Sequence, residues 1–305
     1  MACRFEITLP AEDQRGVDVA REALDYIDHL EDQLTVFRDS SEICFINRTA
    51  ASRPVRIEPK LFNLLLLAQR LYKESDGAFD ITSGPLTRCW GFFRRQGCLP
   101  DATELSAVLQ LVGMDQLLFD VESGTLQFTQ SAIEINLGSI GKGYALDAIA
   151  TKMRGRGTKA ALLSAGSSSV LALGPGSGNE GWLVGLRHPR RRDTRWVTVR
   201  LRECALATSG SGEQFFEVDG RRYGHVIDPR TGWPAAGIAT VTVIAPTAAE
   251  ADALATAFFV GGPELAERYC SRHQEVLALI LTDDGLDNPL IIGGSTRCSL
   301  EFACD

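Results

Sequence analysis

The stretch ATSGSGEQFFEVDGRRYGHVIDPRTGWP, residues 207–234, is the most informative part of the chain for fold and function. Its Thr-Ser-Gly-Ser-Gly run predicts a turn, a short hairpin follows, and the stretch ends in HVIDPRTG at 225–232. Proline removes a donor from a strand ladder, and Asp-Pro-Arg-Thr-Gly is typical of turns. A histidine, an acid and an arginine on a loop between apolar flanks are more often functional than structural. A solvated hairpin turn is the alternative.

The regions on either side of this stretch predict separate helices and antiparallel strands. A β-rich region is expected over 159–245, with further strands over 3–9, 117–121, 125–129, 132–136, 276–282 and 289–292. Apolar periodicity and capping residues predict helices over 17–34, 61–72, 101–113 and 141–153, another after the cap at 247–250, and one that opens at Pro263. No linker of biased composition interrupts them. The pattern favours an α+β fold in a single domain over residues 1–305.

Composition restricts the class of protein. The 305 residues carry a formal net charge of -8, which argues against nucleic-acid binding because phosphate neutralisation needs a basic surface. No apolar run is long enough to span a bilayer, and the N-terminal residues lack the apolar core of an export signal. The scattered cysteines without a C-x-x-C pair then indicate reduced thiols in a cytoplasmic protein. The arginine-rich segment 187–195 predicts a solvated hairpin loop or a docking patch for an anionic partner.

Asp252 and Thr256 lie four residues apart in the segment ADALATAFF, residues 251–259. Side chains at that spacing meet on one face of a helix, and their neighbours here are small or apolar. Two oxygen ligands on such a face suit Mg²⁺, which completes its shell with water and phosphate. The alternative is a Thr that bonds back to its own helix. The sequence offers no partner for Asp252, so its removal is expected to leave the protein folded.

The segment EINLGSIGKGYALD, residues 134–147, predicts a strand, a glycine-rich turn and the start of a helix. Backbone N–H groups in such a turn can approach phosphates, and Lys142 adds a positive charge. The segment is not a Walker A loop, because Gly143 rather than Ser or Thr follows the lysine. A tight strand-to-helix corner explains the glycines equally well.

Two further segments could line a pocket for a flat ring. Residues 75–86 read SDGAFDITSGPL and precede the aromatic run at 90–92. Small and aromatic residues with an acid suit such a pocket, although a helix end at Gly77 followed by core aromatics explains them too. Phe37, just after the first long helix, could stack on a ring or pack in the core.

Together these segments resemble the FAD:protein FMN transferase (ApbE) family. The family signatures read approximately LSxYxxDSEI, GAFDIT, DLGGIAKGY, TSGxY, HIIDPxTG and ADALATA. Corresponding segments occur here, in the same order, at 34–43, 77–82, 136–144, 208–212, 225–232 and 251–257. Six ordered motifs over nearly the whole chain make the resemblance specific.

The resemblance implies a T-fold-like architecture with largely antiparallel sheets and separate helices. It also implies Mg²⁺-dependent cleavage of FAD, in which FMN passes through a phosphoester bond to a Thr or Ser of an acceptor flavoprotein and AMP is released. By position, His225 would be catalytic, and the metal ligands would be Asp252, Thr256 and Ser139, the last through its carbonyl. The residues expected to contact FAD are Phe37, Ala78, Phe79, Asp80, Asn136, Lys142 and Ile227.

Four of the positions that depart from the signatures bear on the implied site. Phe37 stands where the family has Tyr, Asn136 where it has Asp, Ser139 where it has Gly or Ala, and Gly212 where it has an aromatic. The first and last could alter flavin stacking, and Asn136 removes a negative charge near FAD. Ser139 should matter least, because the family uses a backbone oxygen there.

The residues suit the implied reaction. Phosphoryl transfer needs positioning, charge neutralisation and a base near the attacking oxygen. Mg²⁺ and Lys142 would supply positive charge, and the His225 imidazole is a suitable proton acceptor. Water could attack in place of a protein hydroxyl, so a FAD pyrophosphatase that gives FMN and AMP is the first alternative. A non-catalytic flavin-binding protein, suggested by the departures, is the second.

Overall fold

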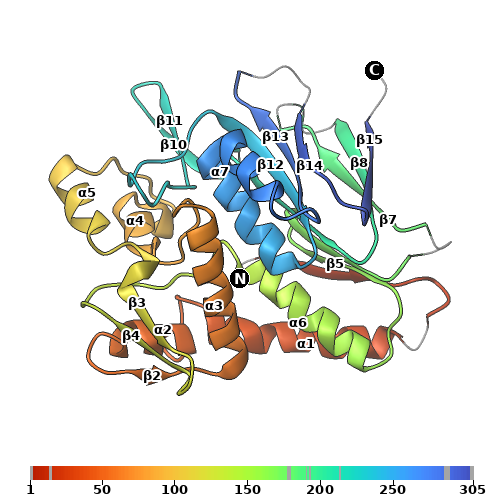
Figure 1. The fold of residues 1–305 in the computed structure, drawn as a ribbon, viewed down its shortest axis with the longest axis horizontal. Coiled ribbons are helices and arrows are strands. Elements are labelled where there is room, and N and C mark those ends of the chain that lie inside the picture. The colour runs from red at the N-terminus through yellow and green to blue at the C-terminus, as the bar shows by residue number, and fades with distance from the viewer. Residues whose placement is uncertain are drawn as a thin grey trace.

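A seven-stranded antiparallel sheet forms the centre of the fold in the computed structural model (Figure 1). The structure describes residues 3–13, 16–176, 180–189, 191, 194–212, 214–284 and 289–302. In order across the sheet, the strands are β1 (Phe5–Thr8), β5 (Ala161–Ala165), β6 (Ser169–Leu173), β9 (Ala205–Gly210), β12 (Ile238–Ala245), β13 (Leu277–Thr282) and β14 (Leu290–Gly293). Every residue of β12 is buried, because this inner strand is covered on both faces.

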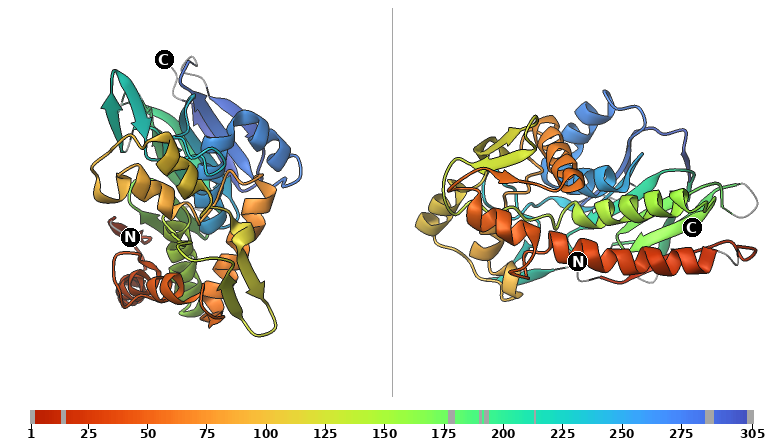
Figure 2. Two further views of the ribbon diagram at one scale, coloured as in Figure 1. Left: turned by 90° about the vertical axis from the view of Figure 1, so that its left-hand side faces the viewer. Right: turned by 90° about the horizontal axis from the view of Figure 1, so that it is seen from below.

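Helices cover one face of this sheet and a smaller sheet covers the other. The helices α6 (Gly141–Gly155) and α7 (Ala248–Cys270) pack on the first face, and α1 (Gly16–Leu34) lies beside α6 (Figure 2). The strands β7 (Trp182–Arg187), β8 (Arg195–Leu201) and β15 (Cys298–Phe302) form the smaller sheet. Alternation along β12 matches this arrangement, since Val243 belongs to the main core and Ile244 to the cluster under the smaller sheet.

The remaining elements gather at one end of the sheet. They comprise α2 (Glu42–Thr49), β2 (Val55–Arg56), α3 (Pro59–Glu74), α4 (Gly84–Cys89), η1 (Phe92–Arg94), α5 (Ala102–Leu109), η2 (Met114–Gln116), β3 (Leu117–Asp120), β4 (Thr125–Phe128), β10 (Phe215–Val218) and β11 (Arg221–Gly224). The hairpin β10–β11 packs with α4, η1 and α5 around Trp90, in an apolar cluster separate from the main core.

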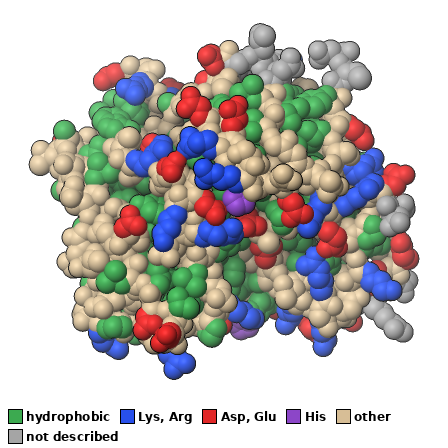
Figure 3. Space-filling view, in the orientation of Figure 1, with side chains coloured by type: hydrophobic (Ala, Val, Ile, Leu, Met, Phe, Trp, Pro, Cys, Tyr) green, Lys and Arg blue, Asp and Glu red, His purple; other side chains and the backbone are tan. Residues whose placement is uncertain are grey.

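Ion pairs join α3 to α7 across the surface. Arg70 Nη2 lies 2.6 Å from Glu250 Oε1, and Arg268 Nη2 lies 2.6 Å from Asp76 Oδ2, just beyond the end of α3. Figure 3 shows acidic and basic side chains intermixed on this face. Exposed pairs of this kind each contribute at most about 1 kcal/mol.

The antiparallel α+β fold and the predicted helices are confirmed. The break expected near Pro263 is also present, because Gly262 adopts φ 71° inside α7 and a second helical segment follows it. Glycine tolerates that conformation, and proline is favourable in the first turn of the segment that resumes.

One predicted strand and part of one predicted turn are wrong. Residues 132–136 form no strand, because Asn47 occupies the backbone groups of Ile135: its Nδ2 donates to the Ile135 carbonyl at 3.0 Å, and its Oδ1 accepts from the Ile135 N–H at 2.8 Å. In the Thr-Ser-Gly-Ser-Gly run predicted as a turn, Ser211 and Gly212 do lie in a turn, but residues 208–210 are the end of β9. There Thr208 and Thr242 pair across the strands with their hydroxyls 2.9 Å apart.

The structure adds two points about the surface. Within the described ranges, no helix has both the length and the apolar character needed to cross a membrane. The arginine-rich segment 187–195 connects β7 to β8, but residues 190, 192 and 193 lie outside the described residues.

Candidate active site

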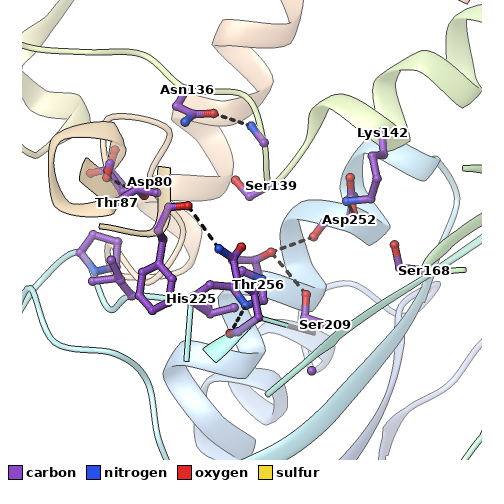
Figure 4. Close-up of a pocket in the computed structure, with 18 of the residues that line it drawn as sticks. Asp80, Thr87, Asn136, Ser139, Lys142, Ser168, Ser209, His225, Asp252 and Thr256 are labelled. Atoms are coloured by element: carbon purple, nitrogen blue, oxygen red, sulfur yellow. Dashed lines mark hydrogen bonds and ion pairs between the residues drawn. The ribbon is translucent and has the colours of Figure 1, made fainter. Parts of the chain in front are cut away.

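A cavity of about 270 Å³ lies where α6, α7 and β9 meet the loops that follow α3 and β11 (Figure 4). Side chains far apart in the sequence border it, and most of the residues singled out above are among them. The residues that line it are Ala78, Asp80, Ser83, Thr87, Phe92, Asn136, Gly138, Ser139, Lys142, Ser168, Thr208, Ser209, Gly210, Gln214, His225, Val226, Ile227, Pro229, Asp252 and Thr256.

Asp252 is the buried carboxylate of this cavity, with 4% of its surface exposed. Its Oδ1 lies 3.2 Å from Lys142 Nζ and accepts a hydrogen bond from Ser169 Oγ at 3.2 Å. Its Oδ2 accepts from the Gly143 N–H at 3.1 Å. The expectation that Asp252 has no partner is therefore wrong. Its charge is compensated by Lys142 and by the N-terminal end of α6, whose first N–H groups have no partner within the helix.

The α6–α7 crossing brings Lys142 and Asp252 together. A Cβ atom on Gly143 would lie 2.0 Å from the Ala248 carbonyl oxygen, so only glycine allows the helices this close. Asp147, one turn along α6, accepts hydrogen bonds from the N–H groups of Ala248 and Ala249 at 2.9 and 2.8 Å. Burial raises the pKa of this carboxyl to about 6. The start of each helix is thus held by a carboxylate of the other.

Thr256 lies one turn after Asp252 and borders the same cavity. Its hydroxyl is 3.3 Å from the Asp252 carbonyl, to which it donates, and 3.5 Å from Ser209 Oγ. The back-bond expected of a helical Thr is therefore present, and the hydroxyl also faces the cavity (Figure 4). Ser139, on the turn before α6, borders the cavity as well.

Asp80 is the second buried carboxyl of the cavity. Burial raises its pKa to about 6, although hydrogen bonds from Thr82 oppose this shift. Asp80 Oδ1 accepts from the Thr82 N–H at 2.7 Å and from the Thr82 hydroxyl at 2.6 Å. These two hydrogen bonds fix the orientation of the carboxyl.

The other residues expected to contact FAD occupy different environments. Ala78, Asn136 and Ile227 border the cavity, and Asn136 Oδ1 accepts from the Gly138 N–H at 3.0 Å, shaping the glycine-rich turn. Phe79 does not border it, because its side chain is buried in the main core. Phe37 does not border it either. Phe37 is 71% exposed, and its ring stacks on that of Phe93 at 4.6 Å between centroids.

His225 borders the cavity on the wall opposite α6, after the end of β11. Its Nδ1 lies 3.1 Å from the Gln214 carbonyl oxygen, which only accepts hydrogen bonds. In the neutral ring, Nδ1 therefore carries the proton and Nε2 carries the lone pair. The ring also meets Phe92 edge-on at 6.5 Å between centroids. In that tautomer, Nε2 is the ring atom that can accept a proton.

The rest of the HVIDPRTG loop holds the loop's shape. Asp228 accepts hydrogen bonds from the backbone N–H and the guanidinium of Arg230, the latter at 2.9 and 2.8 Å. Trp90 Nε1 donates to the Gly232 carbonyl at 2.8 Å. The Trp90 contact anchors the loop to the cluster around Trp90, and the contact between Asp228 and Arg230 stabilises the loop itself. His225 and Ile227, by contrast, border the cavity.

Several cavity residues had no assigned role from the sequence. Thr208, Ser209 and Gly210 lie in a segment whose resemblance to the family was clear, so its motif could have indicated them. The buried Ser169, which does not border the cavity, and Gln214, which does, carry no such signal. Each acts through one contact, with the Asp252 carboxylate and with His225 Nδ1 respectively, that only the folded chain creates.

Comparison with known proteins shows the family of the chain. The model of the ApbE family matches residues 1–281. The chain belongs to the ApbE family. A FAD:protein FMN transferase of Klebsiella pneumoniae (strain 342) is 34% identical over 259 residues, 83% of this chain and 73% of the relative. One from Treponema pallidum (strain Nichols) is 35% identical over 246 residues, 76% of this chain and 68% of the relative.

Solved structures of the ApbE family agree with the fold. The ApbE protein of Thermotoga maritima MSB8 has a TM-score of 0.83 at 28% identity, covering 96% of this chain and 97% of that one. The flavin transferase ApbE of Vibrio cholerae has a TM-score of 0.81 at 25% identity, covering 97% and 95%. The chain is an enzyme of this family, with the family's α+β architecture.

Proposed function

We propose that this protein is a Mg²⁺-dependent FAD:protein FMN transferase. It cleaves FAD, attaches FMN to a Thr or Ser hydroxyl of an acceptor flavoprotein and releases AMP. The observation that carries the proposal is one cavity bordered by a helix-borne Asp and Thr, a lysine at a helix N-terminus and an oriented histidine, in a chain whose relatives are named FAD:protein FMN transferases.

The residues present fit a magnesium ion. Asp252, Thr256 and Ser139 border the same cavity and offer oxygen atoms, the ligands that Mg²⁺ prefers. No group of three or more His, Cys, Asp or Glu side chains suited to a metal occurs in the described part of the chain. A single carboxylate among the donors suits an ion that keeps water and substrate phosphate in its shell. When bound, Mg²⁺ would neutralise charge on the pyrophosphate.

Lys142 would bind the pyrophosphate. Its ammonium lies 3.2 Å from Asp252 Oδ1, at the edge of the cavity and beside the N-terminus of α6. A phosphate entering there meets both the ammonium and the positive end of the helix. The pairing with Asp252 positions the ammonium before FAD arrives.

In the transfer step, the acceptor hydroxyl gives its proton to His225 Nε2 and attacks the phosphorus of the FMN half. A bond forms between the acceptor oxygen and that phosphorus. The bond from the same phosphorus to the bridging oxygen breaks, and AMP leaves with the bridging oxygen. The products are a phosphodiester on the acceptor, AMP and one proton, which His225 later releases to solvent. The protein supplies position, positive charge and a base, as phosphoryl transfer requires.

Co-expression with candidate flavoproteins tests the proposal. The expected result is a mass increase equal to one FMN phosphoester on a Thr- or Ser-containing peptide of an acceptor, and AMP released in equal amount in vitro. A FAD pyrophosphatase would instead release AMP with FAD and Mg²⁺ alone, at a rate that no acceptor changes. AMP without any adduct would overturn the transferase proposal in favour of hydrolysis.

A further inference from the structure

A second hollow, of about 470 Å³, meets the cavity at His225. It lies between η1 with the loop after it and the hairpin β10–β11. The residues that line it are Phe92, Arg95, Gly97, Gln214, Phe215, Phe216 and His225. Three of them, Phe92, Gln214 and His225, border the first cavity as well. The oriented histidine therefore stands between two spaces, and we call the second one the aromatic groove.

The aromatic groove offers a chemistry unlike that of the cavity. It contains neither Lys142 nor the oxygen donors of Asp252 and Thr256, so it lacks the proposed magnesium ligands of the cavity. Three phenylalanine rings form its walls, and Phe215 is 40% exposed. Arg95 stands at its edge in an exposed position, and no carboxylate of the described residues forms an ion pair with Arg95. A groove lined by aromatic rings and one exposed cation suits an extended peptide segment that carries an acidic side chain.

The groove is held open by packing. A Cβ atom on Gly97 would lie 2.0 Å from Phe216 Cδ1, so the backbone of the loop after η1 rests directly on this ring. Phe216 in turn stacks on Tyr223 at 5.4 Å, and Gln214 Nε2 donates to the Phe92 carbonyl at 3.2 Å. These contacts join both walls to the cluster around Trp90. A bound segment would meet a preformed surface, which lowers the entropic cost of binding.

The reaction itself requires a second entrance. The FMN phosphorus must lie in the cavity with Lys142 and Asp252, while the acceptor hydroxyl must come within hydrogen-bond distance of His225 Nε2. An acceptor that entered through the cavity would compete with FAD for the same space. The aromatic groove is the neighbouring space that His225 also borders.

We propose that the aromatic groove receives the acceptor segment bearing the Thr or Ser hydroxyl, and that Arg95 selects an acidic residue next to that hydroxyl. This inference rests on the proposed transferase function. A neighbouring hollow lined by Arg187 and Arg222 also adjoins the cavity, through Lys142 and Thr208, but His225 does not border it. A hydroxyl presented from that hollow would lack the base.

Two short synthetic peptides with one central Thr test the proposal, one with Asp on both sides of the Thr and one with Lys. Formation of the FMN adduct is followed by mass spectrometry with FAD and Mg²⁺. We expect the wild type to use the Asp peptide with a kcat/KM at least about tenfold higher, since juxtaposed like charges are disfavoured and tenfold corresponds to only about 1.4 kcal/mol. The Arg95→Glu variant should lose or reverse this preference.

The matched control is Arg187→Glu, which makes the same charge change at the neighbouring hollow and should keep the wild-type preference. If Arg187→Glu lost the preference for the Asp peptide and Arg95→Glu kept it, the proposal that the acceptor segment binds in the aromatic groove would be wrong. Equal use of both peptides by the wild type would also contradict it. Modification of a folded flavoprotein but of neither peptide would contradict acceptor binding in the groove and leave the transferase function standing. Adducts on no acceptor, with AMP still released, would overturn the transferase function and the groove with it.

A second pair of variants tests the apolar walls. Phe215→Ala removes an exposed ring that lines both the groove and the neighbouring hollow, which the two arginine variants distinguish. Phe302→Ala removes a ring of similar exposure, 43%, from β15 in the smaller sheet. Phe215→Ala should raise the KM for the Asp peptide about three- to tenfold, as expected for losing part of the burial of one ring. Phe302→Ala should leave it unchanged. Equal effects of the two variants would contradict a bound segment in the groove.

Discussion

The two walls of the active-site cavity are built differently. The α6–α7 wall, which carries Lys142, Asp252 and Thr256, belongs to the main core, and Gly143 packs directly against the backbone of α7. The opposite wall carries His225 on a loop after a two-stranded hairpin, and the apolar side chains Phe216, Val218 and Tyr223 of this hairpin belong to the smaller cluster around Trp90. The α6–α7 wall is therefore part of the main core, whereas the wall that carries His225 lies next to a smaller, separate apolar cluster.

This difference suggests a division of labour. Groups that hold the same nucleotide and metal in every reaction cycle need fixed relative positions, which buried helices provide. Groups that meet an acceptor protein need to suit that protein, and loops tolerate such changes more easily. We infer that changes on the helix wall affect FAD and metal binding, while changes on the hairpin wall affect transfer. The predictions below test this division, from the largest expected effect to the smallest.

The Asp252→Asn variant should give the largest effect. Replacing the only carboxylate among the proposed metal ligands should lower AMP release by at least about 10³-fold, because a bound cation contributes several kcal/mol to the transition state. Asparagine keeps one acceptor oxygen for the Gly143 N–H, whereas alanine would remove the contacts that Asp252 makes with Lys142 and Gly143. AMP release is measured across a magnesium titration. Unchanged activity and magnesium dependence would refute the metal assignment.

The Asp80→Asn variant should change how stability depends on pH. A carboxyl whose folded pKa is raised to about 6 contributes stability below its unfolded pKa near 4, and that contribution is lost as pH rises through 6. Wild-type unfolding free energy should therefore fall between pH 4 and 6, by up to about 1.4 kcal/mol per pH unit from this group. The asparagine side chain of the variant would keep both Thr82 hydrogen bonds and remove that fall.

Urea unfolding at several pH values measures this slope. Asp147, with a pKa also raised to about 6, keeps part of the slope in the variant. The exposed Asp25→Asn variant on α1 is the control and should retain the wild-type slope. If the unfolding free energy of Asp80→Asn depended on pH as steeply as that of the wild type, burial would not raise the pKa of Asp80.

The Lys142→Ala variant should weaken FAD binding in a salt-dependent way. The loss should be up to about fivefold at low ionic strength, as for a partly exposed charge pair, and should shrink as salt screens the contact. Calorimetric titration at two salt concentrations measures it. Lys152→Ala, at the other end of α6, should leave FAD affinity unchanged. Equal losses at both salt concentrations would argue against a phosphate contact.

The smallest effect should come from Phe37→Ala. Phe37 does not border the cavity and stacks on Phe93, so FAD affinity should change by less than about twofold. A ring that stacked on the flavin would contribute about 1–3 kcal/mol, as aromatic side chains do on nucleobases. A loss of FAD affinity greater than about fivefold would therefore show that Phe37 turns toward the flavin when FAD binds.

Local sequence signals predicted much of the fold. The cap at Thr247 and the Gly-Pro at 262–263 defined both parts of α7, because each acts on its own turn of helix. The strand expected over 132–136 failed for the opposite reason. Asn47, 88 residues away, takes both backbone hydrogen bonds of Ile135, and no local pattern reports such a contact.

The candidate site was likewise predictable where the signal is local and not where it depends on long-range contacts. The ordered motifs identified Asp252, Thr256, Lys142 and His225, and the folded chain brings all four to one cavity. The partners that tune these groups were not predictable. The Gly143 N–H that binds Asp252 lies 109 residues away, and the Gln214 carbonyl that orients His225 comes from an irregular segment before β10. The exposure of Phe37 could not be predicted from the motif that contains it either.

His225 offers the most direct test of a catalytic hairpin wall. In single-turnover transfer with saturating FAD, the wild-type rate should rise with pH as the imidazole deprotonates and then level off. His225→Ala should lower the rate about 10²–10⁴-fold and lose that rise, while FAD affinity stays within about twofold. His225→Asn keeps the hydrogen-bonding ability needed for a purely structural role. Wild-type rates in His225→Asn would contradict the base assignment and leave the helix wall as the principal source of catalysis.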